Sequence, residues 1–169
     1  GWGCIDSPVA IVGQSLCEQC MEPQEPFCEG SGSLLETSYG LADCRKADLF
    51  VTNAVHCRPP GNRKSRDHEI VNCSSYLYRE LEIVRPRLVI GLGEDAKRVL
   101  SFLYPTARKV HSRFDPPSNL RSTTVPCLYF ASHPSWVKRQ HRPALEEAYV
   151  SSLADALKWA ISKGSLAGS

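Results

Sequence analysis

The sequence predicts an α/β fold, a three-layer α/β/α sandwich with a central four-stranded parallel sheet. Two observations predict it: four short, nearly continuous apolar runs rich in β-branched or aromatic residues, and segments of helical periodicity between them. Nearly continuous apolar runs are typical of strands that are buried on both faces, as in a parallel sheet. Strands that alternate with helices indicate βαβ crossovers, with helices covering the sheet.

The four expected strands read VAIVG, LFVTNAV, RLVIGLG and PCLYFAS, and they lie at residues 9–13, 49–55, 87–93 and 126–132. Four helices are expected at residues 31–41, 65–84, 93–104 and 145–162. The first of these helices has the weakest pattern. The second repeats apolar residues at steps of three and four and ends before Pro86, whereas the last closes at Gly164.

The length of 169 residues fits one domain, which we place at residues 1–164, with 165–169 as a flexible tail. A net charge of +2 does not by itself indicate nucleic-acid binding, although a local basic patch still can. No stretch approaches the ~18 apolar residues of a membrane span, and the start does not resemble a signal peptide. We therefore expect a cytoplasmic monomer without a membrane partner.

Eight cysteines are many for an intracellular protein. A disulfide framework, a metal or cluster site, and plain buried thiols all remain open from the count alone. In parallel sheets the functional loops lie outside the carboxyl ends of the strands. This rule places Cys17, Cys20, Cys28 and Cys57 at that edge, with Cys73 on the following helix close to it.

The stretch richest in candidate chemistry is VTNAVHCRPPGNRKSRDHEIVNC at residues 51–73. Asn53 leaves a strand, Cys57 opens a rigid and basic turn, and Cys73 follows on the next helix. This run resembles the uracil-DNA glycosylase superfamily, above all its family 4 type, which carries an iron–sulfur cluster. The resemblance extends over residues 9–137, through VGQS with PF and GSGSLL, then EIVRPRLVIGLG, and finally SHPSW.

The resemblance implies a pocket for a base that has been flipped out of DNA. Gly13 opens the first motif, and Phe27 would stack on the base. The amide of Asn53 has both an acceptor and donors, so it can bond N3–H and O4 of uracil. His133 would donate to O2 and stabilise the departing anion. Core packing, turn capping and a buried structural histidine are the non-catalytic alternatives for these three side chains.

The basic segment around the last motif is a candidate DNA-binding surface. Trp136 and Val137 are candidates to wedge into the base stack, while Lys138, Arg139 and Arg142 are candidates to bind phosphates. Arg63, in the turn after Cys57, and Ser135 are also assigned to DNA binding. The alternative is a solvated basic loop. His111, outside the motifs, is expected to be a surface residue.

The resemblance implies four cysteine ligands for a [4Fe-4S] cluster. In family 4 a cysteine pair precedes the first strand, where this sequence has only Cys4. We therefore predict Cys17, Cys20, Cys57 and Cys73 as the ligands, and Cys28 is the spare candidate. Four thiolates also suit zinc, which is the less favoured metal. Free thiols without any cluster are the remaining alternative.

The first motif departs from the family at its acid. Family 4 has a glutamate where this sequence has Gln14, and the family 1 aspartate falls on Ser15. Neutral side chains can orient water but cannot take its proton, so a weakened general base is expected. The leading prediction is a glycosylase that hydrolyses the N-glycosidic bond of uracil or a related modified pyrimidine. The alternatives are a non-hydrolytic protein that binds modified or damaged DNA, and a zinc-stabilised domain without a DNA role.

Overall fold

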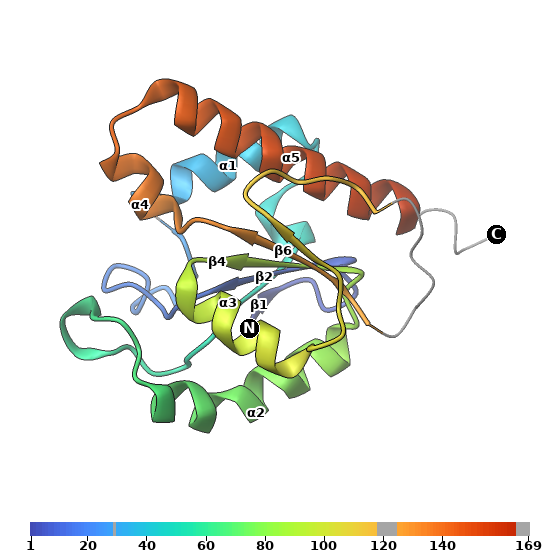
Figure 1. Ribbon diagram of the computed structural model, residues 1–169. Coiled ribbons are helices and arrows are strands. Elements are labelled where there is room, and N and C mark those ends of the chain that lie inside the picture. The colour runs from blue at the N-terminus through green and yellow to red at the C-terminus, as the bar shows by residue number, and fades with distance from the viewer. Residues whose placement is uncertain (29, 118–124, 165–169) are drawn as a thin grey trace.

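The computed structural model describes residues 1–28, 30–117 and 125–164, so the tail predicted at 165–169 lies outside the described residues. Its centre is a twisted sheet with helices on both faces (Figure 1). In sheet order the strands are β1 (Trp2–Gly3), β3 (Phe50–Asn53), β2 (Val9–Gly13), β4 (Leu88–Leu92), β6 (Cys127–Ala131) and β5 (Lys109–His111). All neighbouring strands are parallel except β1, which pairs antiparallel with β3.

The predicted α/β/α sandwich is confirmed, and the four expected strands form the parallel centre of the sheet. The two strands that flank this centre, β1 and β5, were not predicted. They are only two and three residues long, and β5 carries Lys109 and His111 around the single buried Val110. Short polar strands are common at sheet edges, where they limit pairing with other chains, and they have little hydrophobic periodicity to detect.

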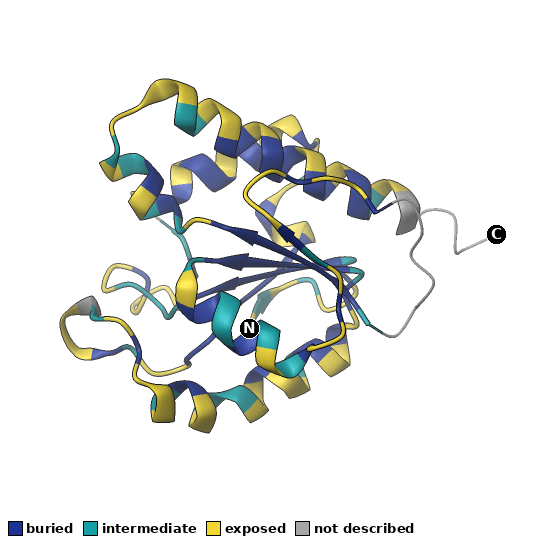
Figure 2. Ribbon diagram, viewed as in Figure 1, coloured by how far each residue is buried: buried dark blue, intermediate teal, exposed yellow. Residues whose placement is uncertain are grey.

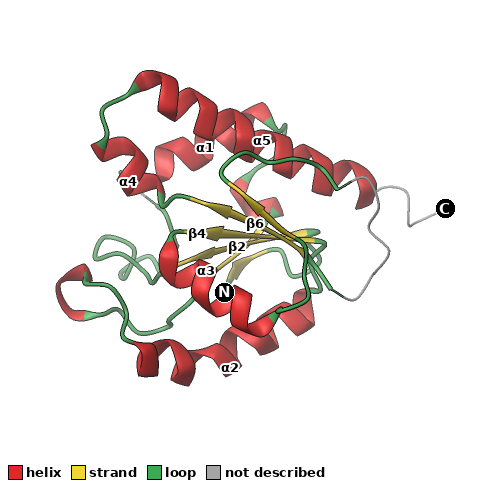
Figure 3. Ribbon diagram, viewed as in Figure 1, coloured by secondary structure: helices red, strands yellow, loops and turns green. Residues whose placement is uncertain are grey.

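The helices form the two outer layers (Figure 3). On one face lie α1 (Gly32–Leu41), α4 (Pro134–Arg139) and α5 (Pro143–Gly164), and on the other lie α2 (Asp67–Val84) and α3 (Glu94–Leu103). Two short 3₁₀ turns, η1 (Lys46–Asp48) and η2 (Pro60–Asn62), occur in the connections. The predicted helices are confirmed with small changes at their ends, and α4 is an additional short helix.

Alternation along each central strand divides the core in two. Val9 and Ile11 of β2 pack towards α1 and α5, whereas Ala10 and Val12 pack towards α2 and α3. Successive side chains of a strand point to opposite faces, so a strand covered on both faces is buried throughout. All five residues of β2 are buried, as are those of β4 and β6 (Figure 2).

Local signals explain where the helices begin and end. The carboxylate of Glu69 accepts a hydrogen bond of 2.7 Å from the Arg66 backbone N–H at the start of α2. That helix ends at Arg85, whose left-handed φ of 49° breaks the helical path before Pro86. Proline is the first residue of both α4 and α5, where its missing N–H is not needed. In the described part of the chain, no helix combines the length and apolarity needed to cross a bilayer.

Replacing Ser152 by alanine is expected to lower the free energy of unfolding by about 1–3 kcal/mol. The buried Ser152 hydroxyl accepts from the Phe114 N–H at 2.7 Å and lies 2.7 Å from the Tyr129 hydroxyl. Alanine leaves that N–H without its acceptor inside the core. Urea denaturation measures the change, and Ser151→Ala on the exposed side of α5 is the matched control. Equal stabilities of the two variants would contradict this account.

Candidate functional site

Four parallel strands deliver the candidate residues to one edge of the sheet. Gln14 follows β2, Asn53 ends β3, Gly93 follows β4, and His133 comes two residues after β6. Backbone hydrogen bonds continue beyond the strands, because the Ala54 N–H donates to the Gly13 carbonyl at 2.8 Å. The loops are thereby held in register at the carboxyl edge, where ligands bind in open α/β sheets.

Phe27 and Asn53 converge over Gly13. A Cβ atom placed on Gly13 would lie 2.8 Å from Cζ of Phe27 and 2.9 Å from Oδ1 of Asn53, so only glycine fits there without a shift. Asn53 is 8% exposed, and its Oδ1 is buried without a hydrogen-bond partner. Buried polar atoms are nearly always paired, so an unpaired amide oxygen beside an aromatic ring indicates a binding position for a donor group.

Phe27 is fixed in an unusual backbone conformation. Its φ is 54°, in the left-handed region that bulky residues rarely adopt. Its carbonyl lies so close to Gly32 at the start of α1 that a Cβ on Gly32 would come within 2.2 Å of it. Strained residues of this kind persist where the surrounding structure determines them, and they cluster at ligand sites. The Phe27 ring is half-buried, with its centroid 6.1 Å from that of His133.

The hydrogen bonds of His133 define which ring nitrogen carries the proton. Nδ1 accepts from the Ser135 backbone N–H at 3.3 Å and lies 2.6 Å from the Ser135 hydroxyl. A backbone N–H only donates, so in the neutral ring the proton is on Nε2. Burial, and then the positive charge of Arg139, lower the pKa of His133 from its ordinary value of 6.5. A neutral imidazole with an Nε2–H donor is therefore the form favoured at pH 7.

Gln14 is tied to the segment before α2. Its Nε2 donates to the Arg63 carbonyl at 2.7 Å and to the Ser65 hydroxyl at 3.5 Å. This leaves the amide oxygen of Gln14 as the group that can accept a hydrogen bond from water. Ser15 follows on the same loop and is half-buried.

Two cavities adjoin His133. One, of about 370 Å³, is lined by His133, Trp136 and three residues that the sequence did not single out as functional, Gly93, Lys97 and His111. The other, of about 180 Å³, is lined by Gln14, His133, Asp95 and their neighbours. His111 is exposed as expected, but it lines a cavity of the site. Lys97 and Asp95 lie on α3 directly after β4, a position that the strand-end rule identifies.

The predicted DNA-contacting residues divide into two groups. Trp136 is 45% exposed on α4, and the exposed Arg139 and half-buried Lys138 follow it. Val137 is 1% exposed and packs in the core, so the suggestion that it wedges into DNA is wrong. Adjacent residues of a helix do not share a face. Val137 follows the exposed Trp136 on the six-residue α4, so its side chain points towards the core.

Arg63 has a protein partner. Its guanidinium donates to both oxygens of Glu69, at 2.6 and 2.9 Å. Hydrogen bonds from Arg63 and from the Arg66 backbone lower the pKa of Glu69 to about 2. The pair therefore stays ionised, and it offsets much of the charge that Arg63 would offer to a phosphate.

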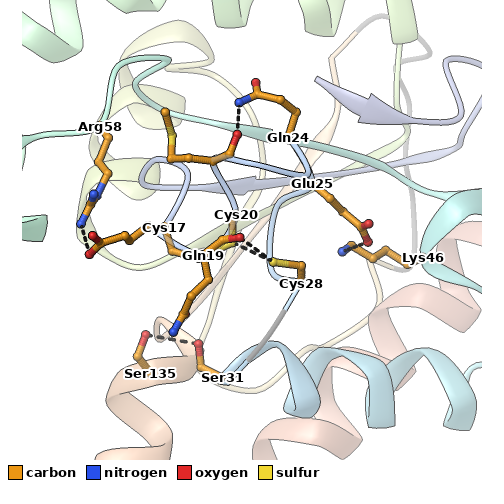
Figure 4. Close-up of a disulfide and its surroundings, with 12 residues drawn as sticks. Cys17, Gln19, Cys20, Gln24, Glu25, Cys28, Ser31, Lys46, Arg58 and Ser135 are labelled. Atoms are coloured by element: carbon orange, nitrogen blue, oxygen red, sulfur yellow. Dashed lines mark hydrogen bonds and ion pairs between the residues drawn. A yellow bond between two sulfur atoms is a disulfide. The ribbon is translucent and has the colours of Figure 1, made fainter.

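Three cysteine sulfur atoms gather in the loop between β2 and α1 (Figure 4). The Sγ atoms of Cys17, Cys20 and Cys28 lie within 4.8 Å of one another, an arrangement that can hold a metal ion. In the structure Cys17 and Cys20 form a disulfide, and the Cys28 thiol lies 3.4 Å from Sγ of Cys20. Thiolates are the metal-binding form of cysteine, so metal binding here requires the Cys17–Cys20 pair to be reduced.

Cys57 and Cys73 do not join this group among the described residues. Cys57 is exposed and Cys73 is half-buried, and both are free thiols. One contact does connect the two loops, because Arg58 forms an ion pair of 3.1 Å with Glu18. These residues are the immediate neighbours of Cys57 and Cys17. The predicted set of four cysteines therefore stays a prediction, with Cys28 closer to the Cys17–Cys20 pair than expected.

The fold and this edge define an α/β/α domain whose site combines an aromatic ring, an unpaired amide oxygen and an imidazole donor. Residues 1–157 match the Uracil DNA glycosylase superfamily. The chain belongs to this family, as its sequence motifs predicted.

Several type-4 uracil-DNA glycosylases and a type-5 uracil-DNA glycosylase are similar to it. A type-4 uracil-DNA glycosylase of Archaeoglobus fulgidus is 32% identical over 156 residues, covering 89% of this chain and 76% of that protein. One of Pyrobaculum aerophilum is 34% identical over 111 residues, or 65% and 57% of the two chains. A type-5 uracil-DNA glycosylase of the same organism is 43% identical over 89 residues, or 52% and 36%. The last two alignments thus cover less than two thirds of those proteins.

Proposed function

We propose that this protein is a DNA glycosylase that hydrolyses the N-glycosidic bond of uracil, or of a related modified pyrimidine, flipped out of DNA. The observation that carries the proposal is the unpaired Oδ1 of Asn53 beside the Phe27 ring. An amide oxygen in that position accepts from N3–H of uracil, and the amide nitrogen donates to O4. Family membership supports the same reaction class.

Each of these residues then has a separate role in the proposed reaction. Phe27 stacks on the base, and Asn53 reads its Watson–Crick edge. As the bond from N1 to the sugar breaks, negative charge develops on the pyrimidine, and the Nε2–H of His133 donates to O2. A donor already oriented by Ser135 stabilises that charge without rearranging. Trp136, Lys138 and Arg139, with Ser135 on the same helix, would contact the DNA. We propose that DNA is the partner of this protein and that the protein is intracellular.

The direct test is cleavage of single- and double-stranded oligonucleotides that contain uracil, with abasic sites revealed by alkali. Strand scission above the level of Asn53→Ala and His133→Ala controls is the expected result. A panel of modified pyrimidines in the same strand defines the preferred base. Scission no greater than that of both controls on every substrate would overturn the proposal.

A second candidate is a non-hydrolytic protein that binds modified or damaged DNA. It is favoured by Gln14, which replaces the acid and whose amide nitrogen is engaged by the Arg63 carbonyl. This candidate predicts tight binding of uracil-containing DNA without release of the base. Cleavage that appears only in Gln14→Glu would support it, whereas cleavage by the unaltered protein would exclude it.

We further propose that the protein binds a [4Fe-4S] cluster through Cys17, Cys20, Cys57 and Cys73, with zinc as the alternative. The donor chemistry fits once the Cys17–Cys20 pair is reduced, because such clusters need four thiolates and the β2–α1 loop gathers three cysteines. The ion pair between Glu18 and Arg58 holds the Cys57 loop against that loop. When bound, the cluster would supply a cross-link near Phe27 rather than a group that reacts with the base.

Single Cys→Ser variants distinguish the ligand sets. Anaerobically purified Cys17→Ser and Cys20→Ser are expected to lose most of their iron and sulfide. These two residues belong both to the predicted set and to the group that Cys28 joins in the structure. Loss in Cys57→Ser and Cys73→Ser, with retention in Cys28→Ser, supports the predicted set. The reverse pattern assigns Cys28 as a ligand instead. The half-buried thiol Cys4 belongs neither to the predicted set nor to the Cys17, Cys20 and Cys28 group, so Cys4→Ser is the control. Zinc without iron in the anaerobic protein would contradict the cluster.

A further inference from the structure

Asp95 is a buried carboxylate with one oxygen in use and one free of hydrogen bonds. It lies in the first turn of α3 and is 5% exposed. Its Oδ2 accepts from the Ser65 backbone N–H at 2.9 Å. Its Oδ1 is buried and accepts no hydrogen bond. Oδ1 forms an ion pair of 3.9 Å with the Arg98 guanidinium, and Arg98 also pairs with the exposed Asp67.

This carboxylate borders the same cavity as Gln14 and His133. The cavity of about 180 Å³ is lined by Gln14, Lys64, Leu92, Gly93, Glu94, Asp95 and His133. One water needs only ~15 Å³ of such space, and polar groups on several sides are what fix it there. Gln14 and Asp95 are also linked through Ser65, whose hydroxyl lies 3.5 Å from Nε2 of Gln14 and whose N–H bonds Asp95.

A structural role accounts for only part of this arrangement. An acid in the first turn of a helix interacts favourably with the helix dipole, and the bond from Ser65 anchors the preceding loop. The bond from Ser65 uses Oδ2 alone. Neither effect gives Oδ1 a hydrogen-bond donor, although Oδ1 is buried and Asp95 lines the cavity that His133 borders. The ion pair with Arg98, at 3.9 Å, is longer than a hydrogen bond.

We propose that Asp95 supplies the carboxylate that is missing at positions 14 and 15, an inference that rests on the proposed glycosylase function. A water in the cavity donates to Oδ1 of Asp95 and to the amide oxygen of Gln14. As the bond between the sugar C1′ and N1 breaks, its electron pair goes to the pyrimidine, which accepts a hydrogen bond from His133. The water oxygen bonds to C1′, and its proton passes to Asp95.

The test compares single-turnover cleavage of uracil-containing DNA by the unaltered protein and by Asp95→Asn. The expected loss is about 10²-fold, the lower range for a general base. The variant retains Arg98, which pairs with Asp95, and the charged or titratable groups that line the same cavity, Glu94, Lys64 and His133. Asp95→Asn,Gln14→Glu is expected to recover activity.

Two variants separate catalysis from folding. Asp67→Asn removes the exposed acid that shares Arg98 with Asp95, and it should cleave at the rate of the unaltered protein. Asp95→Ser replaces the carboxylate by a smaller hydroxyl, so it should fold and still lose activity. Full activity in either Asp95 variant, or an equal loss in Asp67→Asn, would overturn the role of Asp95 and leave the glycosylase proposal standing. An unaltered protein that cleaves no substrate would overturn both.

Discussion

Replacing His133 by alanine is expected to slow the cleavage of uracil-containing DNA by about 10²–10³-fold, the range for removing one oriented donor to a developing anion. The basis is geometric. Ser135 holds Nδ1 as an acceptor, which leaves the Nε2–H as the donor, and the Phe27 ring lies 6.1 Å away between centroids. Single-turnover kinetics on a uracil-containing single strand measures the chemical step. The exposed His68→Ala on α2 provides the matched control.

His133 also makes the stability of the protein depend on pH. A purely structural histidine and a catalytic one would both have this effect. Burial lowers the pKa of His133 in the folded state, so the unfolded chain takes up a proton at a higher pH than the folded one. The stability associated with a neutral, buried His133 is present above the unfolded-state pKa of about 6.5. It is lost as the pH falls towards the lower pKa of the folded state. The rate, and not this pH dependence, therefore decides the catalytic role. A His133→Ala protein that cleaves as fast as His68→Ala would contradict it.

The central strands were predictable because burial on both faces leaves a continuous apolar run, as in Val9–Gly13 and Leu88–Leu92. The convergence of Asn53 and His133 followed from the rule that parallel strands present their carboxyl ends at one edge. By contrast, β1 is a two-residue strand, and its pairing of Trp2 with Val51 has no periodic signature. Val137 was misassigned because its inward direction depends on how α4 packs against the core.

Asp95 shows a different limit. The strand-end rule points to the residues directly after β4, but a single acid after a strand is usually a solvated helix start. What distinguishes Asp95 is its burial and an Oδ1 without a hydrogen bond, while its Oδ2 accepts from the N–H of Ser65, thirty residues earlier in the chain. The cysteines behave similarly. Spacing identified the Cys17–Cys20 pair, whereas the approach of Cys28 depends on how the loop folds back before α1.

Replacing Asn53 by alanine is expected to slow cleavage by about 10²–10³-fold while leaving the folded state at least as stable. The activity falls because the pocket loses both the acceptor for N3–H and the donor for O4 of the base. The measurement pairs single-turnover cleavage with urea denaturation of the free protein. Asn72→Ala, which removes an exposed amide from α2, is the control for both quantities.

Activity and stability are expected to respond differently because Oδ1 of Asn53 has no hydrogen-bond partner in the free protein, whereas in the proposed complex the flipped base would supply one. A buried acceptor without a partner destabilises the fold by about 1–3 kcal/mol, and Oδ1 of Asn53 is such an atom. Alanine removes that atom, and the small space it leaves offsets part of the gain. A turn-capping asparagine would behave otherwise, since its loss would lower stability and activity together. Reduced stability of Asn53→Ala relative to Asn72→Ala would therefore identify Asn53 as structural, whereas lost activity with retained stability identifies it as the residue that reads the base.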